Sequence, residues 1–106
     1  MSQELYNNIG REIGGQFGSS AGQMFGKPCL KTSENKAFAA FFKEEMVFKL
    51  GQQEITFFKD KYPNSTNWDP SGKKRPMKDR LQVPADFKGH WKVLAKQALD
   101  YVEENK

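Results

Sequence analysis

The sequence has few of the features that mark secreted, membrane or disulfide-bonded proteins. It contains one cysteine, Cys29, which cannot form an internal disulfide. Its longest apolar run, residues 37–42, is far shorter than the roughly 20 residues that span a bilayer. Residues 1–6 lack a basic start and an apolar stretch, so they do not read as a secretory signal. These absences predict a cytoplasmic protein in a reducing compartment, without membrane association.

Residues that commonly hold metals or cofactors are also scarce. Cys29 and the single histidine, His90, cannot supply a structural zinc site, and the acidic residues lack the spacing of a calcium loop. The glycines of residues 9–15 follow no predicted strand and match no nucleotide-binding fingerprint. The sequence therefore predicts no metal, no cofactor and no catalytic constellation. One alternative stays open, a small-ligand protein or enzyme using His90 and Cys29, against an inert buried thiol at Cys29.

What the chain does contain is a large supply of aromatic residues. Its 106 residues include nine Phe, two Trp and three Tyr, which is apolar area for one core but too little chain for two. Residues 1–106 are therefore expected to form a single domain. The net charge of +4 arises from 17 Lys and Arg against 13 Asp and Glu. This excess permits contact with nucleic acid, but it also serves solubility, so charge alone selects neither.

Hydrophobic periodicity predicts helices at both ends of the chain. Leu5, Ile9, Ile13 and Phe17 recur at every fourth residue, and a stripe with spacings of three and four follows Trp91. The expected elements are a helix over 2–18, strands over 23–31, 36–42 and 46–50, a helix over 52–61, a short strand at Trp68, a strand over 76–83 and a helix from 86. The order α-β-β-β-α-β-β-α predicts an α+β two-layer sandwich, an antiparallel five-stranded sheet with helices mainly on one face.

Residues 36–50 form the clearest feature, a hairpin closed by the charged turn at residues 43–45. Its second strand alternates, with Met46 and Phe48 on one face and Val47 on the other. The first strand is apolar on both faces, and a single layer of helices covers only one of them. The uncovered face predicts contact with a partner protein or with a second copy in a dimer. The residues expected there are Ala37, Ala39, Phe41 and Val47.

Cations gather on the face of the predicted sheet that lies opposite its core. In the strand over 76–83, alternation sets Lys78 and Arg80 opposite Met77 and Leu81. The basic residues expected on this surface are Lys27, Lys31, Lys49, Lys73, Lys74, Arg75, Lys78 and Arg80. Such a surface, interleaved with aromatic side chains, suits a nucleic-acid backbone or another polyanion. The solvated outer face of an antiparallel sheet has the same composition, so both interpretations stay open.

Short motifs give the chain a resemblance to a known family. Over residues 22–102, the segments Met24-Phe25-Gly26, Val47-Phe48-Lys49-Leu50 and Arg75-Pro76-Met77-Lys78 resemble the N-terminal domain of the competence regulator TfoX. Many short stand-alone bacterial proteins resemble that domain. The resemblance implies a two-layer fold with a five-stranded antiparallel sheet and no established enzyme activity. One departure is Asp79-Arg80, where the family usually has glycine followed by an aromatic residue.

The resemblance and the hairpin together favour a non-enzymatic interaction domain. It would act through protein–protein contacts, with a regulatory role implied only by the link between TfoX and transcriptional control of competence. The first alternative is a nucleic-acid-associated module that uses the basic face. The second is the small-ligand protein or enzyme that uses His90 and Cys29.

Overall fold

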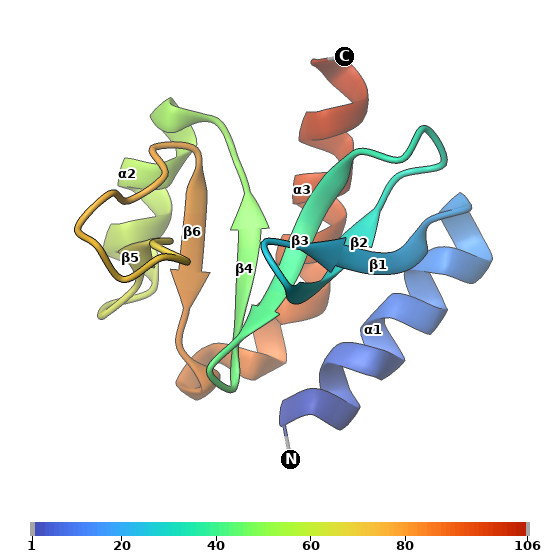
Figure 1. Ribbon diagram of the computed structural model, residues 1–106, viewed down its shortest axis with the longest axis horizontal. Helices are drawn as coiled ribbons and strands as arrows, with labels where there is room; N and C mark the ends of the chain where they lie inside the picture. Colours follow the sequence, from blue (N-terminus) through green and yellow to red (C-terminus); the bar gives the residue numbers. More distant parts are fainter. Residues whose placement is uncertain (1, 106) are drawn as a thin grey trace.

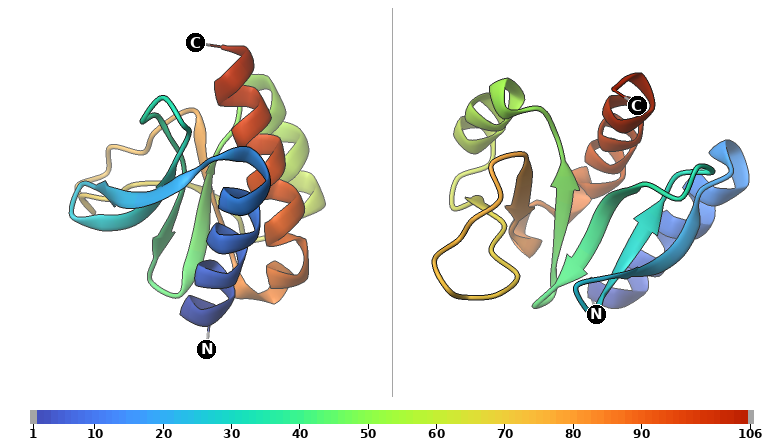
Figure 2. Two further views of the ribbon diagram at one scale, coloured as in Figure 1. Left: turned by 90° about the vertical axis from the view of Figure 1, so that its right-hand side faces the viewer. Right: turned by 45° about the horizontal axis from the view of Figure 1, so that its top comes forward.

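The chain folds into a six-stranded antiparallel sheet with its α-helices on one face (Figure 1). The computed structural model describes residues 2–105. In chain order the elements are α1 (Ser2–Phe17), β1 (Ser20–Met24), β2 (Lys27–Lys31), β3 (Ala37–Phe42), β4 (Glu45–Lys49), α2 (Gln52–Lys61), β5 (Thr66–Asn67), β6 (Arg80–Val83), the 3-10 helix η1 (Ala85–His90) and α3 (Trp91–Glu104). A side view shows the helices on one side of the strands (Figure 2, left). The predicted α+β two-layer class is confirmed.

The sheet has one strand more than the sequence predicted, because residues 20–31 form a hairpin instead of a single strand. The strand order is β1-β2-β3-β4-β6-β5. Ser20 pairs with Lys31, and Met24 pairs with Lys27. The intervening residues, Phe25 and Gly26, have φ values of +55° and +73°, which are those of a type I′ turn. A phenylalanine rarely adopts a positive φ, so the residue pattern did not indicate a turn here.

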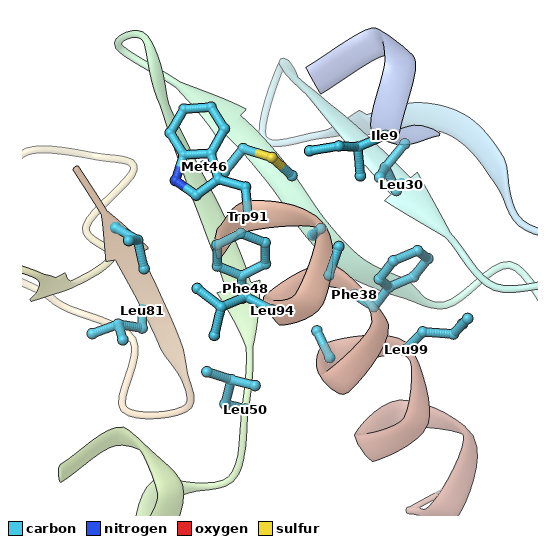
Figure 3. Packing of buried hydrophobic residues seen from close by; sticks show 14 of the residues in the cluster. Ile9, Leu30, Phe38, Met46, Phe48, Leu50, Leu81, Trp91, Leu94 and Leu99 are labelled. Atoms are coloured by element: carbon cyan, nitrogen blue, oxygen red, sulfur yellow. The ribbon is translucent and has the colours of Figure 1, made fainter. Parts of the chain in front are cut away.

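The main core lies between the inner face of the sheet and the helices (Figure 3). It includes Ile9 of α1, Phe48 of β4 and Leu94 of α3, each almost fully buried. Burying one side chain of this size contributes about 1.5–3 kcal/mol to folding. Met46 and Leu50 are buried in the same core, as the alternation around Phe48 predicted. The inner face therefore holds most of the apolar area that stabilises the fold.

A β-bulge between β2 and β3 changes which side chains of β3 face the helices. Lys31 pairs with Ala37, whereas the residue before Lys31 pairs with Ala39, so Phe38 is left without a partner. As a result, Phe38, Ala39 and Phe41 all belong to the main core. The prediction that Ala39 and Phe41 lie on the face away from the helices is therefore wrong, because strict alternation fails at a bulge.

A second and smaller cluster lies on the outer face of the sheet, away from the helices. This outer cluster consists of Cys29, Ala40, Val47 and Trp68, with Met24, Ala37, Phe42 and Met77 packed around them. Trp68 follows β5 and is fully buried. Its ring centroid lies 5.7 Å from that of Phe42 and 6.0 Å from that of Phe25. Since Phe25 is at the tip of the β1–β2 hairpin, this contact joins the two ends of the sheet across its outer face.

Candidate functional site

The outer face brings together basic residues from three strands of the sheet, β2, β4 and β6. Lys27 and Lys31 flank Cys29 on β2, and Lys49 of β4 pairs directly with Arg80 of β6. Lys31, Lys49 and Arg80 each adjoin a strand residue that belongs to the main core, as expected of strands covered on one face. The predicted placement of these cations on a common face therefore agrees with the observed register.

Lys78 and Met77 do not lie where the sequence placed them. The strand predicted over residues 76–83 begins only at Arg80, so Lys78 lies in the preceding turn and not in the ladder. Met77 packs against the outer cluster, whereas Leu81 belongs to the main core. The prediction that Met77 and Leu81 share a face is wrong, because the period-two rule holds only inside a strand.

Asp69 organises the loop that presents Lys73, Lys74 and Arg75. Its carboxylate accepts hydrogen bonds from the Ser71 hydroxyl at 2.9 Å and from backbone N–H groups, including that of Arg75 at 3.2 Å. Desolvation alone would raise the pKa of Asp69, but these hydrogen bonds outweigh it and lower the pKa. The loop is therefore an ordered turn that holds its exposed cations next to the sheet.

Asp79 places a negative charge beside the cations of β4 and β6. Its carboxylate lies 3.9 Å from Lys49 Nζ and 3.5 Å from Arg80 Nη1. Together with Lys36, these residues line a cavity of about 330 Å³. Arg80 also approaches the Met77 sulfur at 3.8 Å, so its side chain lies along the outer cluster. Asp79 thus offsets part of the positive charge at this end of the face.

Aromatic rings lie among the remaining cations of the outer face. The ammonium groups of Lys27 and Lys43 lie 5.4 and 5.2 Å from the ring centroid of Phe42. Phe25, at the hairpin tip, is 61% exposed. The sequence pattern did not indicate Lys43 as part of this surface, because residues 43–45 were predicted only to form a charged turn. Lys43 directly follows Phe42 in the chain, and a cation next to an aromatic residue was the signal that could have indicated this contact.

The residues expected at a protein interface are covered by the chain itself. Ala39 and Phe41 lie in the main core, where the Tyr6 ring of α1 meets Phe41 at a centroid distance of 5.2 Å. Val47 is buried in the outer cluster, and Ala37 packs against that cluster. These four side chains therefore do not form an open apolar face, because the bulge and Trp68 supply the cover that a partner was expected to provide.

Cys29 and His90, the pair that the sequence left open as an alternative, do not come together. Cys29 is buried in the outer cluster, whereas His90 lies on the helix side, where its Nδ1 is 3.3 Å from the Tyr62 hydroxyl. Burial raises the pKa of the Cys29 thiol, and the charges of Lys31 and Arg80 oppose this only in part. The sheet separates the two side chains, so they form no dyad.

Within residues 2–105, no group of His, Cys, Asp and Glu side chains could hold a metal ion. In the same part of the chain, no helix has the length and apolar character needed to cross a membrane. Protein-family models, curated proteins and solved structures were each compared with the chain, and none matches significantly.

Proposed function

We propose that this chain is a non-enzymatic, cytoplasmic binding domain that contacts single-stranded nucleic acid through its outer face. The observation that carries the proposal is Phe25. It is a large apolar side chain, 61% exposed, held at the tip of the β1–β2 hairpin in a strained conformation with φ of +55°. Positive φ in a bulky residue is costly and recurs at functional positions. An exposed ring beside cations is the arrangement on which unpaired bases stack.

The charges around Phe25 suit a phosphate backbone. Lys27 follows the same turn, and Lys43 shares the ring of Phe42 with it. The loop ordered by Asp69 adds the exposed residues Lys73, Lys74 and Arg75 on the same side of the sheet. Cations of this kind release counterions when they bind phosphates, so affinity should fall steeply with salt.

A binding assay with matched phenylalanine variants tests the proposal. Fluorescence anisotropy of a labelled oligothymidine should show binding at low salt that weakens as salt is raised, and weaker binding to a duplex. Phe25→Ala should weaken binding by about 1–3 kcal/mol, the range measured for stacking one base on an aromatic ring. Phe57→Ala is the control, because Phe57 is 58% exposed on α2, away from this face. Absence of binding at low salt, or equal losses in both variants, would contradict the proposal.

The resemblance to the TfoX N-terminal domain supports a second candidate, a regulatory domain that acts through protein contacts. The segments quoted for the resemblance converge in the outer cluster, which contains Met24, Val47 and Met77. The surface that we propose for self-association is a groove of about 440 Å³ between α1 and α3, where Phe17 and Val93 are exposed.

The charged rim of this groove is already neutralised. Lys92 pairs with Glu12, and Lys96 pairs with Asp100 at 2.6 Å, so two copies could meet there without bringing unpaired like charges together. Sedimentation velocity should then show a dimer that Val93→Asp dissociates. A strict monomer across the accessible concentration range would remove this candidate.

A further inference from the structure

The β1 strand is an open edge of the sheet. Within residues 2–105, β1 is terminal in the strand order, and Figure 2 (left) shows it in front with no strand beyond it. Its sequence, Ser-Ala-Gly-Gln-Met, contains no charged residue and no proline, which are the usual devices that prevent another strand from pairing with an edge. The opposite edge strand, β5, is only two residues long. Of the two edge strands in residues 2–105, β1 is therefore the longer one and lacks these protective features.

The register of the β1–β2 hairpin identifies the free backbone groups of this edge. Met24 and Lys27 form the closing pair of a two-residue turn, so Met24, Gly22 and Ser20 exchange hydrogen bonds with β2. The N–H and C=O groups of the alternate residues, Ala21 and Gln23, consequently point away from β2. Both residues are exposed. An added strand would find two complete pairs of donors and acceptors.

A cavity of about 340 Å³ lies directly beneath this edge, between α1 and β1. Ala21, Gly10, Ser19 and Tyr6 are among the residues that line it. Tyr6 is only 4% exposed, and within the described residues neither its hydroxyl nor that of Ser19 has a hydrogen-bond partner. Buried hydroxyls without partners are uncommon in folded proteins. The cavity thus offers unsatisfied polar groups to a side chain that enters from the edge.

Cations flank the edge on both faces of the sheet. On the inner face, Arg11 lines the cavity. On the outer face, the Lys31 side chain lies across Gly22, where a Cβ would be 3.0 Å from Lys31 Cε and 3.5 Å from its Nζ. A strand paired with β1 would place the side chain opposite Ala21 toward the cavity and the side chain opposite Gly22 toward Lys31. Two successive side chains of that strand would therefore point to opposite faces of the sheet, one toward Arg11 and the next toward Lys31.

We propose that β1 is the docking edge for an extended acidic segment of a partner protein, which adds to the sheet as a seventh, outermost strand. Ala21 and Gln23 supply the main-chain hydrogen bonds. Two adjacent carboxylates supply the specificity, one entering the cavity toward Arg11 and the unpartnered hydroxyls of Ser19 and Tyr6, the next lying against Lys31. This is strand addition, in which the backbone gives affinity and alternate side chains give selectivity.

A second copy of this chain fits the edge less well than an acidic segment does. In an antiparallel pairing of two copies, one register satisfies the free N–H and C=O groups of both Ala21 and Gln23. It pairs Ala21 of each copy with Gln23 of the other, so that the two Gly22 residues lie opposite each other at its centre. That register brings the two Lys31 side chains together over the same glycines. Like charges opposite each other in a sheet are destabilising. An acidic segment places a carboxylate where the second lysine would lie.

The test uses a fluorescein-labelled synthetic peptide of about ten residues, alternating Thr and Val around a central Glu-Glu, long enough for one strand. Anisotropy should show binding to the full chain, with Gln-Gln weaker and Lys-Lys absent. Gln23→Pro removes the free N–H without touching a bond to β2, because proline is tolerated at outward positions of edge strands. It should abolish binding, whereas Gln23→Ala, which keeps the N–H, should preserve it.

Further measurements separate the possible outcomes. Lys31→Gln should weaken binding of the Glu-Glu peptide about fivefold or more, the equivalent of one ion pair, and leave Gln-Gln unchanged. Amide exchange at Ala21 and Gln23 should slow when the peptide is bound, a readout that stands even if Gln23→Pro does not fold.

Phe25→Ala should have no effect on peptide binding, so this proposal and the nucleic-acid proposal can fail separately. Equal binding of all three peptides, no binding, or a peptide-free dimer dissociated by Gln23→Pro would overturn the inference.

Discussion

Burial sets the protonation of two weakly acidic side chains, that of Cys29 in β2 and that of Tyr6 in α1. It raises the pKa of both, and the nearby Cys29 adds to the effect on Tyr6. A thiol with a raised pKa is protonated at neutral pH and is a poor nucleophile. At the scale of single residues the structure therefore favours an inert cysteine and leaves the Tyr6 hydroxyl neutral and available as a donor.

Tyr6→Phe should increase stability and change its dependence on pH. The hydroxyl has no partner among residues 2–105, so its removal should raise the free energy of unfolding by about 1 kcal/mol. Above pH of about 10 a tyrosine ionises in the unfolded chain while folded Tyr6 stays protonated, so the wild type should lose stability as pH rises. Urea unfolding between about pH 8 and 11, a range that spans the ordinary tyrosine pKa of about 10, should show a growing difference between the two proteins. A constant difference would contradict this account.

At the scale of elements, two adjacent glycines of α1, Gly14 and Gly15, differ in the space around them. A Cβ on Gly14 would lie 2.9 Å from the Ser19 carbonyl oxygen, whereas nothing lies within 4 Å of a Cβ on Gly15. Gly18 has φ of +75° and its N–H donates to the Gly14 carbonyl at 3.0 Å, which ends the helix as the sequence indicated. Gly14 thus sets how closely α1 approaches Ser19, the residue directly before β1.

Substitutions at these neighbouring glycines should have opposite effects. Gly15→Ala should stabilise the protein by about 0.5–1 kcal/mol, because alanine loses less backbone entropy in a helix. Gly14→Ala should destabilise it by about 1–3 kcal/mol, because the contact with a backbone oxygen is relieved only if β1 shifts. Urea unfolding of both variants measures the difference. Stabilisation by both would show that α1 and β1 are not in the close contact described.

The turn between β3 and β4 is strained in a way that a single substitution should relieve. Lys43 and Glu44 have φ values of +51° and +64°, a type I′ turn made of residues that avoid positive φ. Glu44→Gly should raise the free energy of unfolding by about 1 kcal/mol, since the left-handed conformation costs other residues roughly that much. Glu44→Ala is the control and should give no comparable gain, as measured by thermal unfolding. An equal gain from alanine would point to the lost charge instead of the backbone.

At the scale of the whole molecule, the sheet has buried side chains on both faces, in the main core and in the outer cluster. Trp68 follows the last edge strand, yet it contacts Phe25 at the tip of the first hairpin. The outer cluster buries Cys29 and Val47 and leaves the cations around its margin. The features that we propose for binding therefore lie around this cluster, at Phe25 and the lysines, and at the edge strand β1.

Trp68→Ala should expose the outer cluster. Truncating a buried tryptophan costs about 3–5 kcal/mol, and here it should also speed the reaction of Cys29 with an aromatic disulfide reagent at neutral pH. Trp91→Ala is the matched control, because Trp91 is equally buried but lies in the main core. It should cost similar stability while leaving Cys29 protected in the folded state. Equal reactivity in both variants, measured under native conditions, would show that Trp68 does not shield the thiol.

Several features of this protein could be derived from the residues alone. The α+β class, the α3 stripe that includes Leu94 and Leu99, and the alternation of β4 around Phe48 were all predicted and are observed. Each depends on a repeated local pattern, in which many residues give the same answer about which face is buried. The shared outer face of Lys49 and Arg80 follows from the same rule.

The remaining features depend on single events in the backbone or on contacts between distant segments. A positive φ at Phe25 creates β1 and its open edge, and the unpaired residue Phe38 moves Ala39 and Phe41 into the core. Trp68 covers the outer face only because the two ends of the sheet meet. Periodicity determined which segments form elements, since it averages over many residues. Only the tertiary structure decided which surface is left open, because one turn, one bulge or one distant side chain is enough to change it.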